Sequence, residues 1–123
     1  MTVLIAGAGP AGAHLSALLS RNGIKVILVE KLKDPFEQAF SSAAIPLSAV
    51  YKNNIPIQSI STYWNTWNIY GPDGDNYKWE NSQNLGAVLD FGKLRESLWN
   101  RANHSGVDLL LGWKVIRVSS SNK

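Results

Sequence analysis

The sequence predicts an α/β fold built around a parallel sheet, and its first third carries most of that prediction. A short apolar run from Val3 to Ala6 precedes a glycine-rich stretch that reads GAGPAG. Residues with helical spacing follow, and a second apolar, β-branched run extends from Ile24 to Val29. Continuous apolar runs of this length are typical of strands buried on both faces, and a helix between two such strands makes them parallel.

The segment between the two runs is predicted to form one helix. Its apolar residues recur at helical spacing. Gly23 stands where a helix commonly ends in a left-handed residue. The residues with this spacing are Ala11, Leu15, Leu18 and Leu19.

Each glycine of the GAGPAG stretch has a mechanical role when the stretch lies between a strand and a helix. Gly7 permits a tight turn, Gly9 lets the backbone approach a pyrophosphate, and Gly12 lets the helix pack closely on the strand. The pyrophosphate rests on the helix N-terminus, where free N–H groups favour negative charge. Glu30, at the end of the second strand, is placed to accept hydrogen bonds from ribose hydroxyls. A glycine-rich turn in an ordinary α/β protein is the alternative.

The stretch from Val3 to Lys31 resembles the N-terminus of FAD-dependent oxidoreductases. Their fingerprint often has Pro-Ala between the second and third glycines and Glu at the end of the second strand. The resemblance implies a Rossmann-like FAD-binding βαβ unit and ranks FAD ahead of NAD as the cofactor. The carboxylate of Glu30 argues against NADP, because it would repel the 2′-phosphate. It also implies a basic residue near the phosphates, although a solvated charge is the alternative for Lys31. The expected cofactor-binding residues are Gly7, Ala8, Gly9, Pro10, Ala11, Gly12, Glu30 and Lys31.

A second, shorter resemblance lies in the middle of the chain. Residues 44–47 read AIPL, which follows Cys-Gly-Gly in the geranylgeranyl reductase-like branch of flavoproteins. Ser41, Ser42 and Ala43 replace that tripeptide here. The chain therefore resembles the geranylgeranyl reductase-like or flavin monooxygenase-like group of flavoproteins. Apart from this motif, residues 34–59 read as irregular, because prolines separate short apolar pieces.

An antiparallel hairpin is expected next in the chain. Alternation from Tyr63 to Tyr70, a GPDGDN turn at 71–76 and a run from Tyr77 to Glu80 predict it. Three of the five tryptophans lie in this region. We favour a role in cross-strand pairs, and a wall against a flavin or an apolar substrate is the alternative. These tryptophans are Trp64, Trp67 and Trp79.

A second helix and a third strand are predicted after the hairpin. The helix opens at Asp90 to Lys93 and ends near Gly106, and residues 107–118 supply one long strand or two short ones. The resemblance implies an arginine contact to the cofactor where Phe91 stands, so Lys93 and Arg95 are substitutes, although we expect them on a solvated face. The apolar face of this helix consists of Leu94, Leu98, Trp99 and Ala102.

The chain reads as a single, incomplete FAD-binding domain over residues 1–123. Residues 1–33 form the βαβ fingerprint, 34–89 the irregular segment and hairpin, and 90–118 the helix and third strand. In a doubly wound sheet the later strands lie on one side of the first, which leaves the first strand as an open edge. The relatives implied by the resemblance are longer, and the polar residues 119–123 read as an end or a break point.

Composition excludes several other function classes. The net charge is +3 and the basic residues are scattered, which argues against a nucleic-acid surface. The chain has no cysteine, so we expect neither a disulfide framework nor a thiolate metal site, and a reducing cytoplasm fits. No run is long enough to cross a bilayer. His14 and His104 lack a nearby paired carboxylate, so no metal site is expected and no catalytic residue can be named.

These observations predict the part of a flavin-dependent oxidoreductase that binds the ADP half of FAD. The flavin carries the redox chemistry, and the expected substrate is an apolar organic molecule. Expected partners are FAD, that small-molecule substrate, and a complementing chain or a second copy at the open sheet edge. The alternatives are a non-redox nucleotide-binding module and a non-functional truncated remnant.

Overall fold

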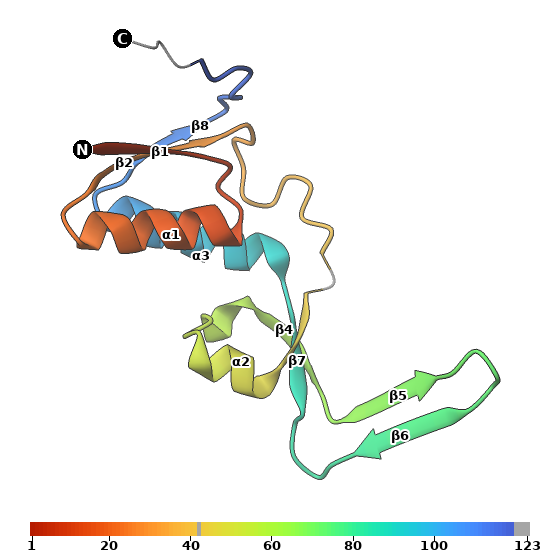
Figure 1. Cartoon of the computed structure of the whole chain (residues 1–123). Coiled ribbons are helices and arrows are strands. Elements are labelled where there is room, and N and C mark those ends of the chain that lie inside the picture. Colours follow the sequence, from red (N-terminus) through yellow and green to blue (C-terminus); the bar gives the residue numbers. More distant parts are fainter. Residues whose placement is uncertain (42, 120–123) are drawn as a thin grey trace. The chain divides into compact units, whose positions relative to one another are not determined.

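The computed structural model of the chain describes residues 1–41 and 43–119 (Figure 1). Ser42 and most of the predicted polar end, residues 120–123, lie outside the described part. The fold is mixed α/β, with a parallel sheet, helices and antiparallel strands, as the sequence predicts. In the described ranges no helix combines the length and the apolar character needed to cross a membrane.

Two compact units make up the chain, and the boundary between them falls within helix α3 (Phe91–His104). The single incomplete domain expected over residues 1–123 stays a prediction, because a division by compactness does not test it. Unit 1 comprises Met1–Ala39 and Arg95–Lys123, and unit 2 comprises Phe40–Leu94.

Unit 1 contains a three-stranded sheet with the strand order β1-β2-β8. β1 (Thr2–Ala6) pairs in parallel with β2 (Lys25–Glu30), and β2 pairs in parallel with β8 (Asp108–Leu111). β1 is therefore an edge strand, since nothing in the described part of the chain pairs with its other side. This arrangement was predicted from the order of the strands in a doubly wound sheet.

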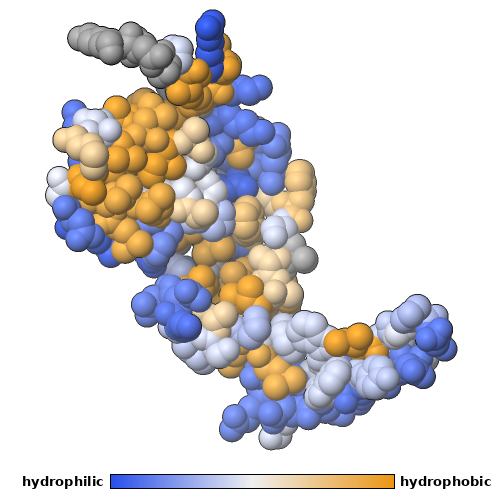
Figure 2. All heavy atoms as spheres, viewed as in Figure 1, coloured by the Kyte–Doolittle hydropathy of each residue, from blue (hydrophilic) through white to orange (hydrophobic). Residues whose placement is uncertain are grey.

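Helix α1 (Pro10–Arg21) packs against the sheet through small side chains rather than through its leucines. The predicted helix is confirmed, but the apolar residues that indicated it are not its buried ones: Leu15 and Leu18 are 48% and 43% exposed, Ala11 is exposed and Leu19 is half-buried. Figure 2 shows the resulting hydrophobic area over this part of unit 1. Small residues are the buried ones at this contact because the helix backbone lies close to the strands. The buried residues of α1 are Ala13, Ser16 and Ala17.

Among the described residues, the two helices that cover the sheet of unit 1, α1 and α3, lie on the same side of it (Figure 1). The predicted burial of the first strand on both faces is therefore wrong, and Leu4 of β1 is 56% exposed. The prediction for α3 is confirmed, because its expected apolar face is buried. That face consists of Leu94, Leu98, Trp99 and Ala102.

Unit 2 contains an antiparallel sheet that the sequence did not predict. β3 (Ala44–Pro46), β7 (Gly86–Leu89) and β4 (Ile60–Trp64) pair in the order β3-β7-β4. Two short helical segments, α2 (Leu47–Lys52) and the 3₁₀ turn η1 (Ile57–Ser59), lie in the stretch expected to be irregular.

The predicted hairpin is present in unit 2 as β5 (Thr66–Tyr70) and β6 (Asn76–Glu80). The strand expected to run continuously into β5 is interrupted at Asn65, just after β4 ends. Trp67 lies directly opposite Trp79, so cross-strand pairing is confirmed for these two tryptophans.

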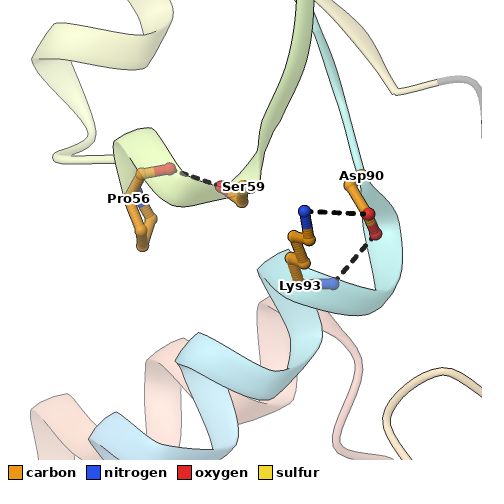
Figure 3. Close-up of polar contacts among 4 residues, drawn as sticks. All are labelled: Pro56, Ser59, Asp90 and Lys93. Atoms are coloured by element: carbon orange, nitrogen blue, oxygen red, sulfur yellow. Dashed lines mark hydrogen bonds and ion pairs between the residues drawn. The ribbon is translucent and has the colours of Figure 1, made fainter.

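Contacts around Asp90 fix the start of α3 within unit 2. The Asp90 carboxylate accepts a hydrogen bond from the Lys93 backbone N–H at 3.0 Å and lies 3.8 Å from its ammonium nitrogen (Figure 3). The Asp90 N–H donates to the Ser59 carbonyl at 2.8 Å, and the Ser59 hydroxyl donates to the Pro56 carbonyl. A carboxylate that caps the first turn stabilises a helix start, which confirms the predicted position.

Candidate functional site: the glycine-rich turn of unit 1

The glycine-rich turn leads from the carboxyl end of β1 into α1. Gly7 has a φ of +98°, a left-handed conformation that glycine adopts at little cost. Its N–H donates to the Val29 carbonyl at 2.8 Å, which ties the turn to β2. The helix begins at Pro10, with Gly9 at its N-cap. The turn therefore has the tight exit from the strand that the sequence predicts.

Gly12 lies in the first part of α1, directly against this turn. A side-chain carbon at Gly12 would collide with the Gly7 carbonyl oxygen and would lie 3.3 Å from a methyl group of Ile5. Any larger residue would therefore push the helix away from the strand and the turn.

The first turn of α1 is open at Gly9. A side-chain carbon at Gly9 would meet no atom within 4 Å. In the described part of the chain no side chain caps this helix, and its first turn contains no acidic residue. Backbone N–H groups at such a helix end bind phosphate groups well. The turn therefore fits the pyrophosphate of a dinucleotide.

Glu30 ends β2 and is only 8% exposed. One carboxylate oxygen accepts a hydrogen bond from the Ala8 N–H at 2.7 Å, and the other accepts one from the Leu32 N–H at 3.0 Å. Each oxygen keeps a further lone pair, so both can also accept a hydrogen bond from a ribose hydroxyl. Glu30 thus holds the glycine-rich turn in place, a role that the sequence did not indicate.

Trp99 of α3 binds the same residue of the turn from another direction. Its indole Nε1–H donates to the Ala8 carbonyl at 2.6 Å, and the residue is 4% exposed. Both backbone polar groups of Ala8 are therefore held by buried side chains. The sequence placed Trp99 only in the apolar face of α3. The available signal was the indole N–H itself, which needs an acceptor when the ring is buried.

A hollow of about 230 Å³ opens where the carboxyl ends of β1 and β2 meet. Its lining includes Glu30 and Lys31, two of the residues that the sequence assigns to cofactor binding, and residues 113–115, which the sequence did not assign to the site. The Trp113 N–H donates to the Glu30 carbonyl at 2.9 Å and so attaches this segment to β2. The lining residues are Ala6, Gly7, Val29, Glu30, Lys31, Trp113, Lys114 and Val115.

The remaining candidate side chains are not among the lining residues of this hollow. Arg95 is buried and donates to the Glu37 carbonyl at 2.8 Å, so the solvated position expected for it is wrong. Lys93 is exposed, as expected. His14 and His104 are both exposed. The described residues contain no group of three or more side chains that could hold a metal ion.

Comparison with known proteins shows which family the N-terminal part of the chain resembles. Residues 1–44 match the FAD binding domain family. The flavin-dependent halogenase armH5 of Armillaria mellea is 43% identical over 58 residues, which cover 47% of this chain and 11% of the halogenase.

Two solved structures share the fold over nearly the whole chain. A geranylgeranyl bacteriochlorophyll reductase-like protein from Thermoplasma acidophilum superposes with a TM-score of 0.85 at 21% identity, over 98% of this chain and 32% of that one. The myxobacterial chondrochloren halogenase CndH superposes with a TM-score of 0.74 at 15% identity, over 96% and 30%. The chain thus spans about a third of the length of these structures.

The fold is similar to that of Rossmann-type FAD-binding proteins, and the family match covers the glycine-rich turn and Glu30. The predicted resemblance to FAD-dependent oxidoreductases of the geranylgeranyl reductase-like and monooxygenase-like groups is confirmed. FAD, which the sequence ranked ahead of NAD, is confirmed as the cofactor of this class.

Proposed function

We propose that unit 1 binds the ADP half of FAD and forms the cofactor-binding part of a flavin-dependent oxidoreductase. The observation that carries this proposal is the open first turn of α1 at Gly9, next to the buried acidic side chain at the end of β2. FAD, when bound, supplies the redox chemistry that protein side chains lack. A cytoplasmic location, expected from the cysteine-free sequence, stays a prediction.

The chain offers a distinct group for each part of the ADP moiety. The pyrophosphate is assigned to the backbone N–H groups that follow Gly9, where the helix dipole favours an anion. The ribose is assigned to the Glu30 carboxylate, and the adenine to the hollow in front of residues 113–115. Lys31 lines this hollow and adds positive charge near the phosphates. The proposed binding residues are Gly7, Ala8, Gly9, Pro10, Ala11, Gly12, Glu30 and Lys31.

A titration of the purified chain with FAD, followed by flavin fluorescence, tests the proposal. We expect saturable binding that ADP reverses, and little competition from NADP, because the Glu30 carboxylate repels a 2′-phosphate. Equal competition by NADP would contradict the role of Glu30. Binding of NAD as tight as that of FAD would favour the non-redox module instead. No binding by a chain with a folded near-UV circular dichroism spectrum would overturn the proposal.

The variant Gly9→Val separates ligand binding from folding. Gly9 has a φ of −65° and a ψ of 178°, which valine adopts readily, and its side-chain position is open. The valine side chain would occupy the space of the pyrophosphate, so we expect FAD binding to be lost while the fold is kept. Gly71→Val is the matched control, because a side-chain carbon at Gly71 makes only ordinary contacts, the nearest at 3.6 Å.

We further propose that the free edge of β1 pairs with a strand of another polypeptide, either a second copy or a complementing chain. Unpaired N–H and C=O groups along an edge strand are a template for such pairing. The exposed Leu4 adds apolar surface on the same strand. Sedimentation velocity at rising protein concentration should show association that Leu4→Lys reduces. A monomer at every concentration would contradict pairing with a second copy.

A further inference from the structure

The peptide that joins Ala8 to Gly9 lies where the glycine-rich turn meets α1. Its carbonyl end is held by Trp99, whose indole Nε1–H donates to the Ala8 oxygen at 2.6 Å. The peptide is trans, so its C=O and its N–H point in opposite directions. Ala8 is fully buried and Trp99 is 4% exposed, which places the hydrogen-bonded end on the buried side of the turn. The Gly9 N–H at the other end therefore points away from the Trp99 indole.

The Gly9 N–H is one of a small set of donors at the start of α1. The first hydrogen bond of the helix runs from the Ala13 N–H to the Gly9 carbonyl at 2.9 Å, so the N–H groups before Ala13 have no intrahelical acceptor. Pro10 has no N–H. The remaining donors belong to Gly9, Ala11 and Gly12, and no described residue accepts a hydrogen bond from the Gly9 N–H. Its direction therefore matters for any anion that the turn binds.

Trp99 is carried on a helix that is attached to the rest of unit 1. The Ser20 hydroxyl of α1 donates to the Ser105 carbonyl, just beyond the end of α3, at 2.5 Å. The Arg21 Nε–H donates to the Ser105 hydroxyl at 3.2 Å. Trp99 itself belongs to the buried face of α3, together with Leu98. A ring packed in a core has few other positions to adopt, so the indole donor is in place before any ligand binds.

We propose that Trp99 is a positioning residue for phosphate binding at the glycine-rich turn. By fixing the Ala8 carbonyl, the indole directs the Gly9 N–H toward the anion, while Trp99 itself is buried and does not contact the ligand. The inference rests on the function proposed above, because it needs the pyrophosphate at this turn. It makes a residue of α3, which is distant in sequence from the turn, a determinant of phosphate affinity.

The same peptide transmits an effect in both directions. A phosphate that accepts a hydrogen bond from the Gly9 N–H polarises the peptide, which makes the Ala8 oxygen a stronger acceptor for the indole. Phosphate binding and the Trp99 hydrogen bond therefore stabilise each other, and the mutual gain is the same whichever forms first. Adenosine has no phosphate, so it should leave the Trp99 hydrogen bond unchanged.

NMR of the ¹⁵N-labelled, unmodified chain tests this coupling without any substitution. ADP and adenosine are titrated separately while the indole and backbone N–H resonances are followed. We expect ADP to move the Trp99 indole proton and the Gly9 amide proton downfield, and adenosine to move neither. The Trp64 indole proton of unit 2 is the internal reference and should not respond. An ADP-bound chain whose Trp99 indole proton stays in place would overturn the proposal.

The variant Trp99→Phe removes the donor and keeps an aromatic ring in the core. We expect ADP to bind about 5-fold more weakly, the loss expected from one hydrogen bond, while adenosine binds as before. The ratio of the two affinities is decisive, because a partly unfolded variant loses affinity for both ligands in equal proportion. Trp64→Phe is the matched control, since it removes the same atoms from unit 2 and should leave the ratio unchanged. An unchanged ratio in Trp99→Phe contradicts the positioning role.

Failure of the proposed function and failure of the positioning role give different results. If the unmodified chain binds no ADP, or if Gly9→Val binds ADP equally well, the turn is not a phosphate site and both proposals are overturned. If the unmodified chain binds ADP and Gly9→Val does not, the phosphate site stands. Equal weakening of ADP and adenosine in Trp99→Phe would then show that Trp99 only supports the fold.

Discussion

Trp99 in unit 1 is buried and Trp64 in unit 2 is half-buried, and the buried indole nitrogens of the two differ in their hydrogen bonds. The Trp99 N–H donates to the Ala8 carbonyl, whereas the Trp64 N–H has no acceptor in the described part of the chain. In unit 1 the chain itself satisfies both backbone polar groups of Ala8. In unit 2 the Trp64 side chain lines an apolar hollow, and its buried donor has no acceptor among the described residues.

The difference shows how the candidate site of unit 1 is prepared. The glycine-rich turn of unit 1 is fixed in advance, because Ala8 is bound on both sides and Gly12 packs on the turn. A ligand there meets backbone N–H groups already in position, which lowers the entropic cost of binding.

The largest effect on stability is expected for Gly12→Val. The valine side chain would collide with the Gly7 carbonyl oxygen, which is backbone and cannot move without opening the turn. We expect the free energy of unfolding to fall by about 3 kcal/mol, measured by urea denaturation. Gly9→Val, three residues earlier and open to solvent, should change it by less than about 0.5 kcal/mol. Equal losses in the two variants would contradict the geometry of the turn.

Glu30→Ala should have the next largest effect. The change leaves the N–H groups of Ala8 and Leu32 without their acceptor, and we expect a loss of about 2 kcal/mol in the free energy of unfolding. Glu30→Gln keeps one acceptor oxygen and should lose less. If both variants unfold at the same urea concentration as the unmodified chain, Glu30 does not hold the turn.

A matched pair of substitutions tests the comparison of the two tryptophans. Trp99→Phe and Trp64→Phe remove the same atoms, but only the first breaks a hydrogen bond. We expect Trp99→Phe to be the more destabilising of the two by about 1 kcal/mol in chemical denaturation. Equal losses, or a larger loss for Trp64→Phe, would mean that the two N–H groups do not differ as described.

The smallest effect is expected for Leu18→Lys on α1. Leu18 lies on the exposed side of the helix, so a charged residue should change the free energy of unfolding by less than about 0.5 kcal/mol. Leu98→Lys on α3 is the contrasting variant, because Leu98 is buried and an unpaired charge there should unfold the chain. A large loss in Leu18→Lys would mean that the leucines of α1, and not its small residues, pack in the core.

The sequence predicted the parts of this fold that depend on local signals. The glycine-rich turn, Glu30 at the end of the second strand, the hairpin and the buried face of α3 each combine a residue type with a short, regular spacing. The edge position of β1 followed from the order of strands in a doubly wound sheet.

Features that depend on tertiary contacts did not emerge from the sequence. The leucines of α1 have helical spacing, but the side of the helix that meets the sheet is chosen by the close approach of small residues such as Ala13 and Ala17. The β3-β7-β4 sheet joins short strands that are distant in sequence. The contact of Trp99 with Ala8 joins residues 91 positions apart, which no local pattern indicates.

Thermal unfolding of the unmodified chain and of Gly9→Val, each with and without ADP, tests the central claim most directly. Without ADP the two should unfold at the same temperature, because Gly9 is open in the unliganded fold. ADP at roughly 100 times its dissociation constant should stabilise the unmodified chain by about 2.7 kcal/mol, a shift of several degrees, and should leave Gly9→Val unchanged. The same ADP shift in both chains would mean that the nucleotide binds elsewhere and that the glycine-rich turn is not its phosphate site.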